Sequence, residues 1–104
     1  MASHRILYVG LDLNLLRLLN GILTGCRVVR CPGGSNAYLL IESDIKYSLL
    51  LFDEESLGAT GAELKRLARS LPHREQTPVI IYKKSDDLSL LVETITRELS
   101  MTKR

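Results

Sequence analysis

The residues best placed to do chemistry follow the most apolar stretch of the chain. Leu49 to Phe52 is a continuous apolar run, and it leads directly into Asp53 and the acidic pair Glu54-Glu55. In open α/β sheets, ligands and reacting groups lie just beyond the carboxyl ends of the strands. A carboxylate at such a position can attack a phosphoryl group or bind Mg²⁺.

Phosphoryl transfer to Asp53 would need a divalent cation, together with cationic or hydroxyl groups around the phosphoryl oxygens. Lys83 and Lys84, which follow a second apolar run, are the candidate phosphoryl contacts. The plainer interpretation is that Asp53 is a strand-end carboxylate, hydrogen-bonded or paired with one of these lysines. The candidate ligands of Mg²⁺ are Asp12, Asp53 and Glu55, and Glu54 is the alternative to Glu55. The plainer interpretation of the pair Glu54-Glu55 is that both side chains are exposed charges on a loop.

The elements that must position these groups follow from the hydrophobic pattern. Short apolar runs predict strands, and leucines spaced along one helical face predict helices between them. The alternation βαβαβαβα predicts a doubly wound parallel sheet with helices on both faces. The predicted strands are Arg5–Val9, Cys26–Cys31, Tyr47–Phe52 and Val79–Tyr82, and the predicted helices span about 15–23, 35–42, 61–71 and 88–101.

Composition limits the function classes. The chain has 104 residues, of which 45% are hydrophobic and 25% charged, so we expect one domain over residues 1–104. The net charge of +2 comes from scattered basic residues, which argues against a nucleic-acid surface. No apolar run is long enough to span a bilayer, and no signal peptide is evident, so we expect a cytoplasmic protein without a membrane contact.

The cysteines and histidines do not predict a catalytic or metal site. Cys26 and Cys31 lie five positions apart on one predicted strand, so their side chains face opposite sides and we expect reduced thiols. His4 and His73 have no neighbour at metal-ligand spacing. We therefore expect no cofactor other than Mg²⁺ at the carboxylates, and no enzymatic turnover.

The pattern resembles the receiver domain of bacterial response regulators, the flavodoxin/CheY-like fold. Asp53 followed by Gly58, Gly61, Glu63 and Leu64 resembles the family's phosphoacceptor strand and the loop and helix after it. The segments RILYVG and TPVII resemble its first and fourth strands. The resemblance implies strand order 2-1-3-4 and a phosphoacceptor at Asp53, with a histidine kinase or an output protein as partner.

The chain departs from the receiver pattern at three places. Receivers carry an acidic pair for Mg²⁺ after the first strand, where this chain has Gly10 and Leu11. They carry Ser or Thr after the fourth strand, where this chain has Lys83. The chain is also too short for the family's last helix-plus-strand unit, so that unit is predicted to be missing. The final helix is expected on the same face as the first, because its lead-in resembles that of the family's final helix.

Loss of the last strand would leave the fourth strand at an edge of the sheet. Its residues Val79, Ile80, Ile81 and Tyr82 would then present unpaired backbone groups, which favour association with another chain. These residues are the candidate interface, and we expect a homodimer. Part of the leucine-rich first helix, with Leu11, Leu13 and Leu18, is either core or a partner surface.

The leading functional hypothesis is a divergent, shortened receiver-like module of a two-component phosphorelay that acts by protein contact, independently of phosphorylation. The first alternative is a genuine phosphoacceptor at Asp53. The second is a small anion- or nucleotide-binding flavodoxin-like protein, with Gly33-Gly34 before a helix as its only phosphate-binding feature. A glycine pair that follows a proline is more often simply a turn, which is the plainer interpretation here.

Overall fold

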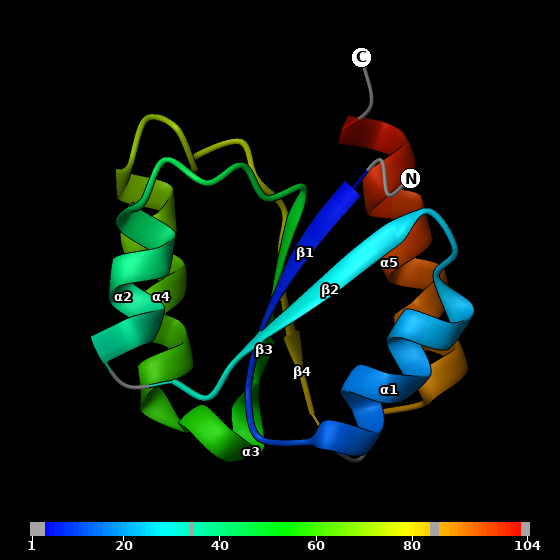
Figure 1. The fold of residues 1–104 in the computed structure, drawn as a ribbon. Helices are drawn as coiled ribbons and strands as arrows, with labels where there is room; N and C mark the ends of the chain where they lie inside the picture. The colour runs from blue at the N-terminus through cyan, green and yellow to red at the C-terminus, as the bar shows by residue number, and fades with distance from the viewer. Residues whose placement is uncertain (1–3, 34, 84–85, 103–104) are drawn as a thin grey trace.

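The computed structural model of the chain describes residues 4–33, 35–83 and 86–102. Its four strands form one parallel sheet in the order β2-β1-β3-β4 (Figure 1). This confirms the predicted doubly wound topology and strand order. The strands are β1 (His4–Val9), β2 (Cys26–Cys31), β3 (Leu49–Asp53) and β4 (Val79–Tyr82).

The helices cover the two faces of this sheet. Figure 1 shows α1 and α5 on one face and α2 and α4 on the other, with short α3 at the end where β3 stops. Two core clusters correspond to the two faces. The helices are α1 (Leu13–Ile22), α2 (Ser35–Glu42), α3 (Glu54–Leu57), α4 (Ala59–Ser70) and α5 (Leu88–Thr102).

The central strands are buried because helices pack on both of their faces. All five residues of β3 are buried, as the unbroken apolar run predicts for a parallel strand. Side chains alternate between the faces, so Tyr8 and Leu51 belong to the α1/α5 cluster, and Val9 and Phe52 belong to the α2/α4 cluster. Tyr8 and Asp53 therefore leave the sheet on the same side, toward α1 and α5.

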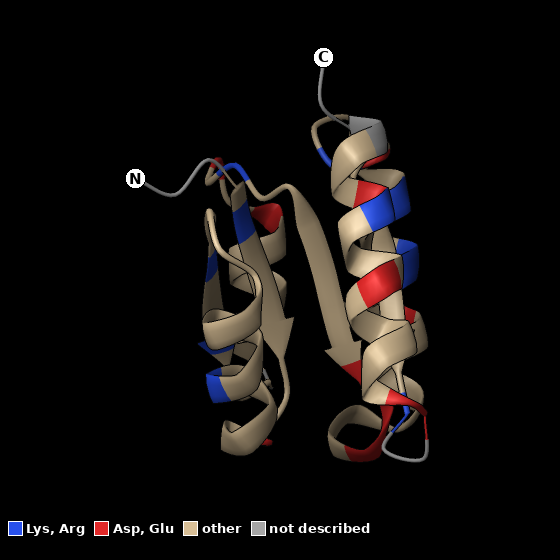
Figure 2. Ribbon diagram, turned by 90° about the vertical axis from the view of Figure 1, so that its right-hand side faces the viewer, with Lys and Arg blue, Asp and Glu red and all other residues tan. Residues whose placement is uncertain are grey.

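The first and last helices share one core. Leu15 and Leu19 of α1 pack in the same cluster as Leu91 and Ile95 of α5. The final helix thus lies on the face predicted for it. Figure 2, which looks onto this face, shows α1 with almost no charged residues and α5 with acidic and basic residues along its length.

The structure differs from the sequence-based boundaries around Asp53. β3 begins at Leu49 instead of Tyr47, and it includes Asp53. Helix α3 was not predicted; it begins directly after Asp53, whose side chain caps it by accepting the Glu55 N–H at 3.1 Å. Gly58, at φ 56°, then breaks the helix, and α4 begins at Ala59, two residues before the predicted start at Gly61.

A buried arginine ties the loop after α4 to the end of α2. Arg74 is only 2% exposed, and its guanidinium donates to the carbonyl oxygens of Leu40, Ile41 and Ser43 at 2.8–3.2 Å. It also lies 5.0 Å from the centre of the Tyr47 ring. The Leu40 carbonyl also accepts from the Ser43 N–H at 3.3 Å and from the Ser43 hydroxyl at 2.6 Å. Because the last carbonyls of a helix have no partner one turn further on, Arg74 acts as a cap of α2 supplied from a distant segment.

No helix among the described residues is long and apolar enough to cross a membrane.

Candidate functional site

The site lies at the carboxyl end of β3, where three donors converge on Asp53. Its Oδ2 accepts from the Tyr8 hydroxyl at 3.0 Å and from Ser56 Oγ at 3.2 Å. Its Oδ1 accepts from the Glu55 N–H at 3.1 Å. The residue is only 5% exposed, so both oxygens of this carboxylate are engaged by the protein itself.

Tyr8 is the partner that sequence reasoning missed. Its side chain is fully buried at the end of β1, and its hydroxyl accepts from the Asp12 N–H at 3.1 Å while donating to Asp53. The Leu11 N–H donates to Ser56 Oγ at 3.1 Å. These bonds join the loop after β1 to β3 and α3 in one network.

Gly10 leaves the space that the Tyr8 ring occupies. A Cβ on Gly10 would lie 2.6 Å from the Tyr8 hydroxyl oxygen and 2.6 Å from the Asp53 Cβ. Gly10 stands where the receiver pattern has the first residue of its acidic pair. A carboxylate at this position and the observed Tyr8 conformation therefore exclude one another.

Burial also keeps the Tyr8 phenol neutral. Desolvation raises the pKa of Tyr8 far above its ordinary value, and the hydrogen bond to Asp53 and the charge of that carboxylate raise it further. The Asp12 N–H opposes them, because it stabilises the phenolate. A neutral phenol next to the Asp53 carboxylate is a stable hydrogen-bond donor throughout the ordinary pH range.

The predicted metal ligands lie around one pocket, where two of them already accept hydrogen bonds from the protein. Asp12, Asp53 and Glu55 line one pocket of about 420 Å³, together with Ser56 and Tyr82. However, Asp12 Oδ1 caps α1 by accepting the Leu15 N–H at 3.1 Å, and the oxygens of Asp53 are already bonded. Among the described residues, no three or more His, Cys, Asp or Glu side chains are arranged to hold a metal ion. The metal-ligand role of Asp12, Asp53 and Glu55 stays a prediction.

The candidate phosphoryl contacts are only partly described. Lys83 is exposed, and its backbone N–H donates to Asp86 Oδ2 at 3.0 Å. Lys84 lies outside the described residues, as does Gly34 of the predicted glycine pair. Gly33, at φ 116°, has the left-handed backbone of a turn residue. The roles predicted for these residues remain predictions.

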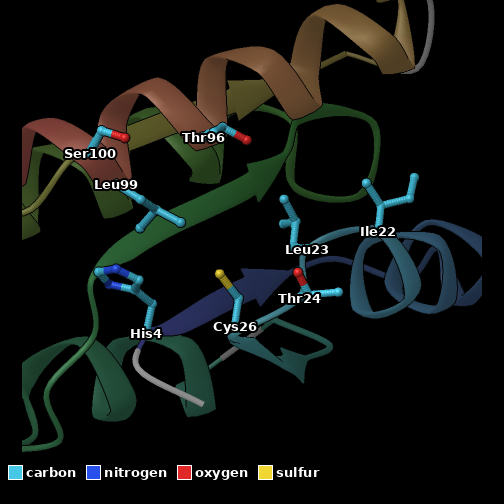
Figure 3. A pocket seen from close by; sticks show the side chains of 8 residues that line it. All are labelled: His4, Ile22, Leu23, Thr24, Cys26, Thr96, Leu99 and Ser100. Carbon is cyan, nitrogen blue, oxygen red and sulfur yellow. The ribbon is translucent and has the colours of Figure 1, made fainter. Parts of the chain in front are cut away.

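A second hollow lies at the opposite end of the sheet, and the His4 and Cys26 side chains that line it are not arranged for catalysis. It has a volume of about 320 Å³ and lies between the ends of α1 and α5 (Figure 3). His4 and Cys26 are neighbours in the β1–β2 register, but His4 Nδ1 is paired with Ser48 Oγ at 3.0 Å. Burial raises the pKa of the Cys26 thiol, which disfavours a nucleophilic thiolate. Cys26 and Cys31 are free thiols on opposite faces, as predicted.

The predicted interface residues lie on β4, which is an edge strand of the sheet. Val79, Ile80 and Ile81 are partly exposed, whereas Tyr82 is 8% exposed and lines the Asp53 pocket. On the α5 side, β4 borders a hollow of about 200 Å³ that is also lined by Leu90 and Thr94.

The geometry described above defines a receiver-like, CheY-like α/β fold. No protein-family model matches the chain, and no curated protein is similar to it in sequence. Three solved structures resemble it in fold. A sensor protein from Polaromonas sp. JS666 has a TM-score of 0.73 at 18% identity, over 97% of this chain and 99% of that chain.

The other two similar structures come from different bacteria. An adenylate cyclase from Rhodopirellula baltica gives a TM-score of 0.74 at 18% identity, over 95% of this chain and 89% of that one. A response regulator from Hahella chejuensis gives 0.64 at 22% identity, over 90% of this chain and 74% of that one. At these identities the likeness establishes the receiver-like fold.

Proposed function

We propose that this chain is a receiver-like signalling domain of a cytoplasmic two-component system that works by protein contact, without phosphorylation and without enzymatic turnover. The observation that carries the proposal is the closed network around Asp53. Its carboxylate is bonded by Tyr8, Ser56 and the Glu55 N–H, and it serves as the helix cap of α3. The receiver-like fold of the three similar structures supports the signalling context.

Two features of the network oppose phosphoryl acceptance. A nucleophilic carboxylate needs a free oxygen and a nearby cation that neutralises the developing charge. Tyr8 holds Oδ2 and excludes a carboxylate from position 10, while Asp12 is engaged as a helix cap. We therefore expect that replacing Tyr8 or Asp53 lowers the stability of the fold and abolishes no phosphoryl transfer, as for a carboxylate with a structural role.

A protein contact must then carry the signal, and β4 is the surface we assign to it. The strand lies at the end of the sheet order, and three of its four residues are partly exposed. An apolar edge strand of this kind is a template for pairing with another chain. We propose that the domain self-associates into a homodimer through this side of the molecule, so the mass in solution should be about 23 kDa, twice the 11.7 kDa of one chain.

The test of phosphorylation independence is exposure to a phosphodonor. The protein is incubated with acetyl phosphate and Mg²⁺, and separately with beryllofluoride and Mg²⁺, beside a phosphorylatable receiver as positive control. We expect no phosphoryl adduct in the intact mass and no displacement of amide signals around Asp53. A Mg²⁺-dependent adduct that disappears in Asp53→Asn would instead support the phosphoacceptor alternative.

One observation favours that alternative. The pocket of about 420 Å³ beside Asp53 is large enough for a phosphoryl group, and Asp12 and Glu55 line it. Acceptance would require Tyr8 to release Oδ2, so the Tyr8→Phe variant should then become the better phosphoacceptor. Absence of an adduct in both wild type and Tyr8→Phe supports the structural role of Asp53.

A further inference from the structure

The two edges of the sheet differ in how their backbone groups are satisfied. On β2, the side chain of Asn20 closes the outer edge: its Oδ1 accepts the Val28 N–H at 3.1 Å, and its Nδ2 donates to the Val28 carbonyl at 3.4 Å. A side-chain amide thus replaces a neighbouring strand at the centre of β2. This edge is protected against pairing with another chain.

The outer edge of β4 is open. The Leu50 N–H donates to the Pro78 carbonyl at 2.9 Å, and the alternation of a parallel ladder then turns the N–H and C=O groups of Val79 and Ile81 away from β3. Within the described chain, no side chain or backbone group bonds to these outward groups. β4 itself contains no charged residue that would discourage pairing.

The charges around β4 favour a second copy in antiparallel orientation. Glu75, before the strand, and Lys83, directly after it, are both exposed. A two-fold axis at Ile80 would pair Val79 of one copy with Ile81 of the other. It would place Lys83 opposite the partner's Thr77, with the partner's Glu75 as its diagonal neighbour two residues further along. Parallel pairing would place like charges side by side.

Helix α5 continues the same self-complementary surface. Leu90 is 56% exposed and lines the hollow beside β4 together with Ile80 and Thr94. The two-fold axis makes the two α5 helices antiparallel and brings the Leu90 side chains of the two copies together.

The geometry points to a symmetric dimer in which β4 pairs antiparallel with β4 of a second copy, extending the sheet across the two-fold axis, while the α5 helices pack through Leu90 above it. This inference rests on the self-association included in the proposed function. It adds the strand, the orientation and the contacting helix.

The test is the mass and dissociation constant of the full chain by light scattering and sedimentation at micromolar concentration. Ile81→Pro removes an N–H that points away from β3, so the internal ladder stays intact while the edge is blocked. We expect this variant to be monomeric with an unchanged circular dichroism spectrum. Leu90→Lys should weaken the dimer, whereas Leu18→Lys, at a leucine 47% exposed on α1, is the matched control and should not.

Charge reversal supplies a test that does not threaten the fold. Glu75→Lys and Lys83→Glu should each raise the dissociation constant about tenfold, and the double variant should restore it, because each reversed charge meets its partner again. A wild-type monomer would overturn both self-association and this geometry. A dimer that survives Ile81→Pro and both single reversals would overturn the geometry alone and leave self-association standing.

Discussion

Replacing Tyr8 by Phe tests directly whether the Asp53 network is structural. The substitution keeps the buried ring and removes only the hydroxyl, which donates to Asp53 Oδ2 at 3.0 Å and accepts from the Asp12 N–H at 3.1 Å. A hydrogen bond to a charged group contributes about 1.5–3 kcal/mol, and the Asp12 N–H would lose its acceptor as well. Ser56 and the Glu55 N–H would still bond Asp53, so we expect a loss of about 2–3 kcal/mol.

The assay is urea denaturation followed by circular dichroism, since the chain contains no Trp. A loss of this size should lower the midpoint by about 1 M with an unchanged slope. The matched control is Tyr38→Phe, which removes an exposed hydroxyl that donates to Glu63 Oε1 at 3.0 Å. An exposed bond of this kind contributes little, so Tyr38→Phe should resemble wild type. Equal stabilities of the Tyr8 and Tyr38 variants would refute the structural role of the network.

Three further predictions follow from the same contacts. The folded-state pKa of Tyr8 is raised from 10.0, so the stabilising effect of Tyr8 should be complete below about pH 10 and decline as the pH rises through the folded-state pKa. The loss of stability caused by Tyr8→Phe, measured in urea, should therefore shrink above about pH 10. A loss that stays constant with pH would contradict this. Gly10→Ala should lower the stability by about 1–3 kcal/mol in the same assay, because the added Cβ would meet Tyr8 and Asp53. Gly21→Ala, where the added Cβ lies in open space on α1, should raise the stability by about 0.5–1 kcal/mol. Equal effects of the two substitutions would refute the steric account. Arg74→Met should cost about 3 kcal/mol, because it leaves the buried Ile41 carbonyl unpaired and removes a donor from the Ser43 carbonyl. This cost should clearly exceed that of Arg69→Met, whose carbonyl contacts are exposed.

The strands were predictable because their signals are local and apolar: an unbroken run such as Leu49 to Phe52 admits few alternatives to a buried parallel strand. Their order was predicted from the resemblance to receiver domains, and the structure has that order. The face of the last helix was predicted from the resemblance of its lead-in. Helix α3 was missed although Asp53 followed by Glu54 and Glu55 carries an N-cap pattern, because those acidic residues were interpreted only as ligands or loop charge.

The site was only half predictable from the sequence. Asp53 was found because it ends a strand, but Tyr8 looked like one more apolar strand residue. Two features taken together would have identified Tyr8 as a partner of Asp53: it stands two positions before Gly10, and its strand is adjacent to the strand that carries Asp53. Arg74 and Asn20 bond backbone groups far away in the sequence or on another element, so no local pattern marks them.

The measurement that tests the central claim most directly is intact-mass analysis after incubation with acetyl phosphate and Mg²⁺, made on wild type, Tyr8→Phe and Asp53→Asn beside a phosphorylatable receiver. If Asp53 is a structural carboxylate held by Tyr8, Ser56 and the Glu55 N–H, none of the three proteins gains a phosphoryl group while the control receiver does. A Mg²⁺-dependent adduct on wild type that is absent from Asp53→Asn would contradict the claim.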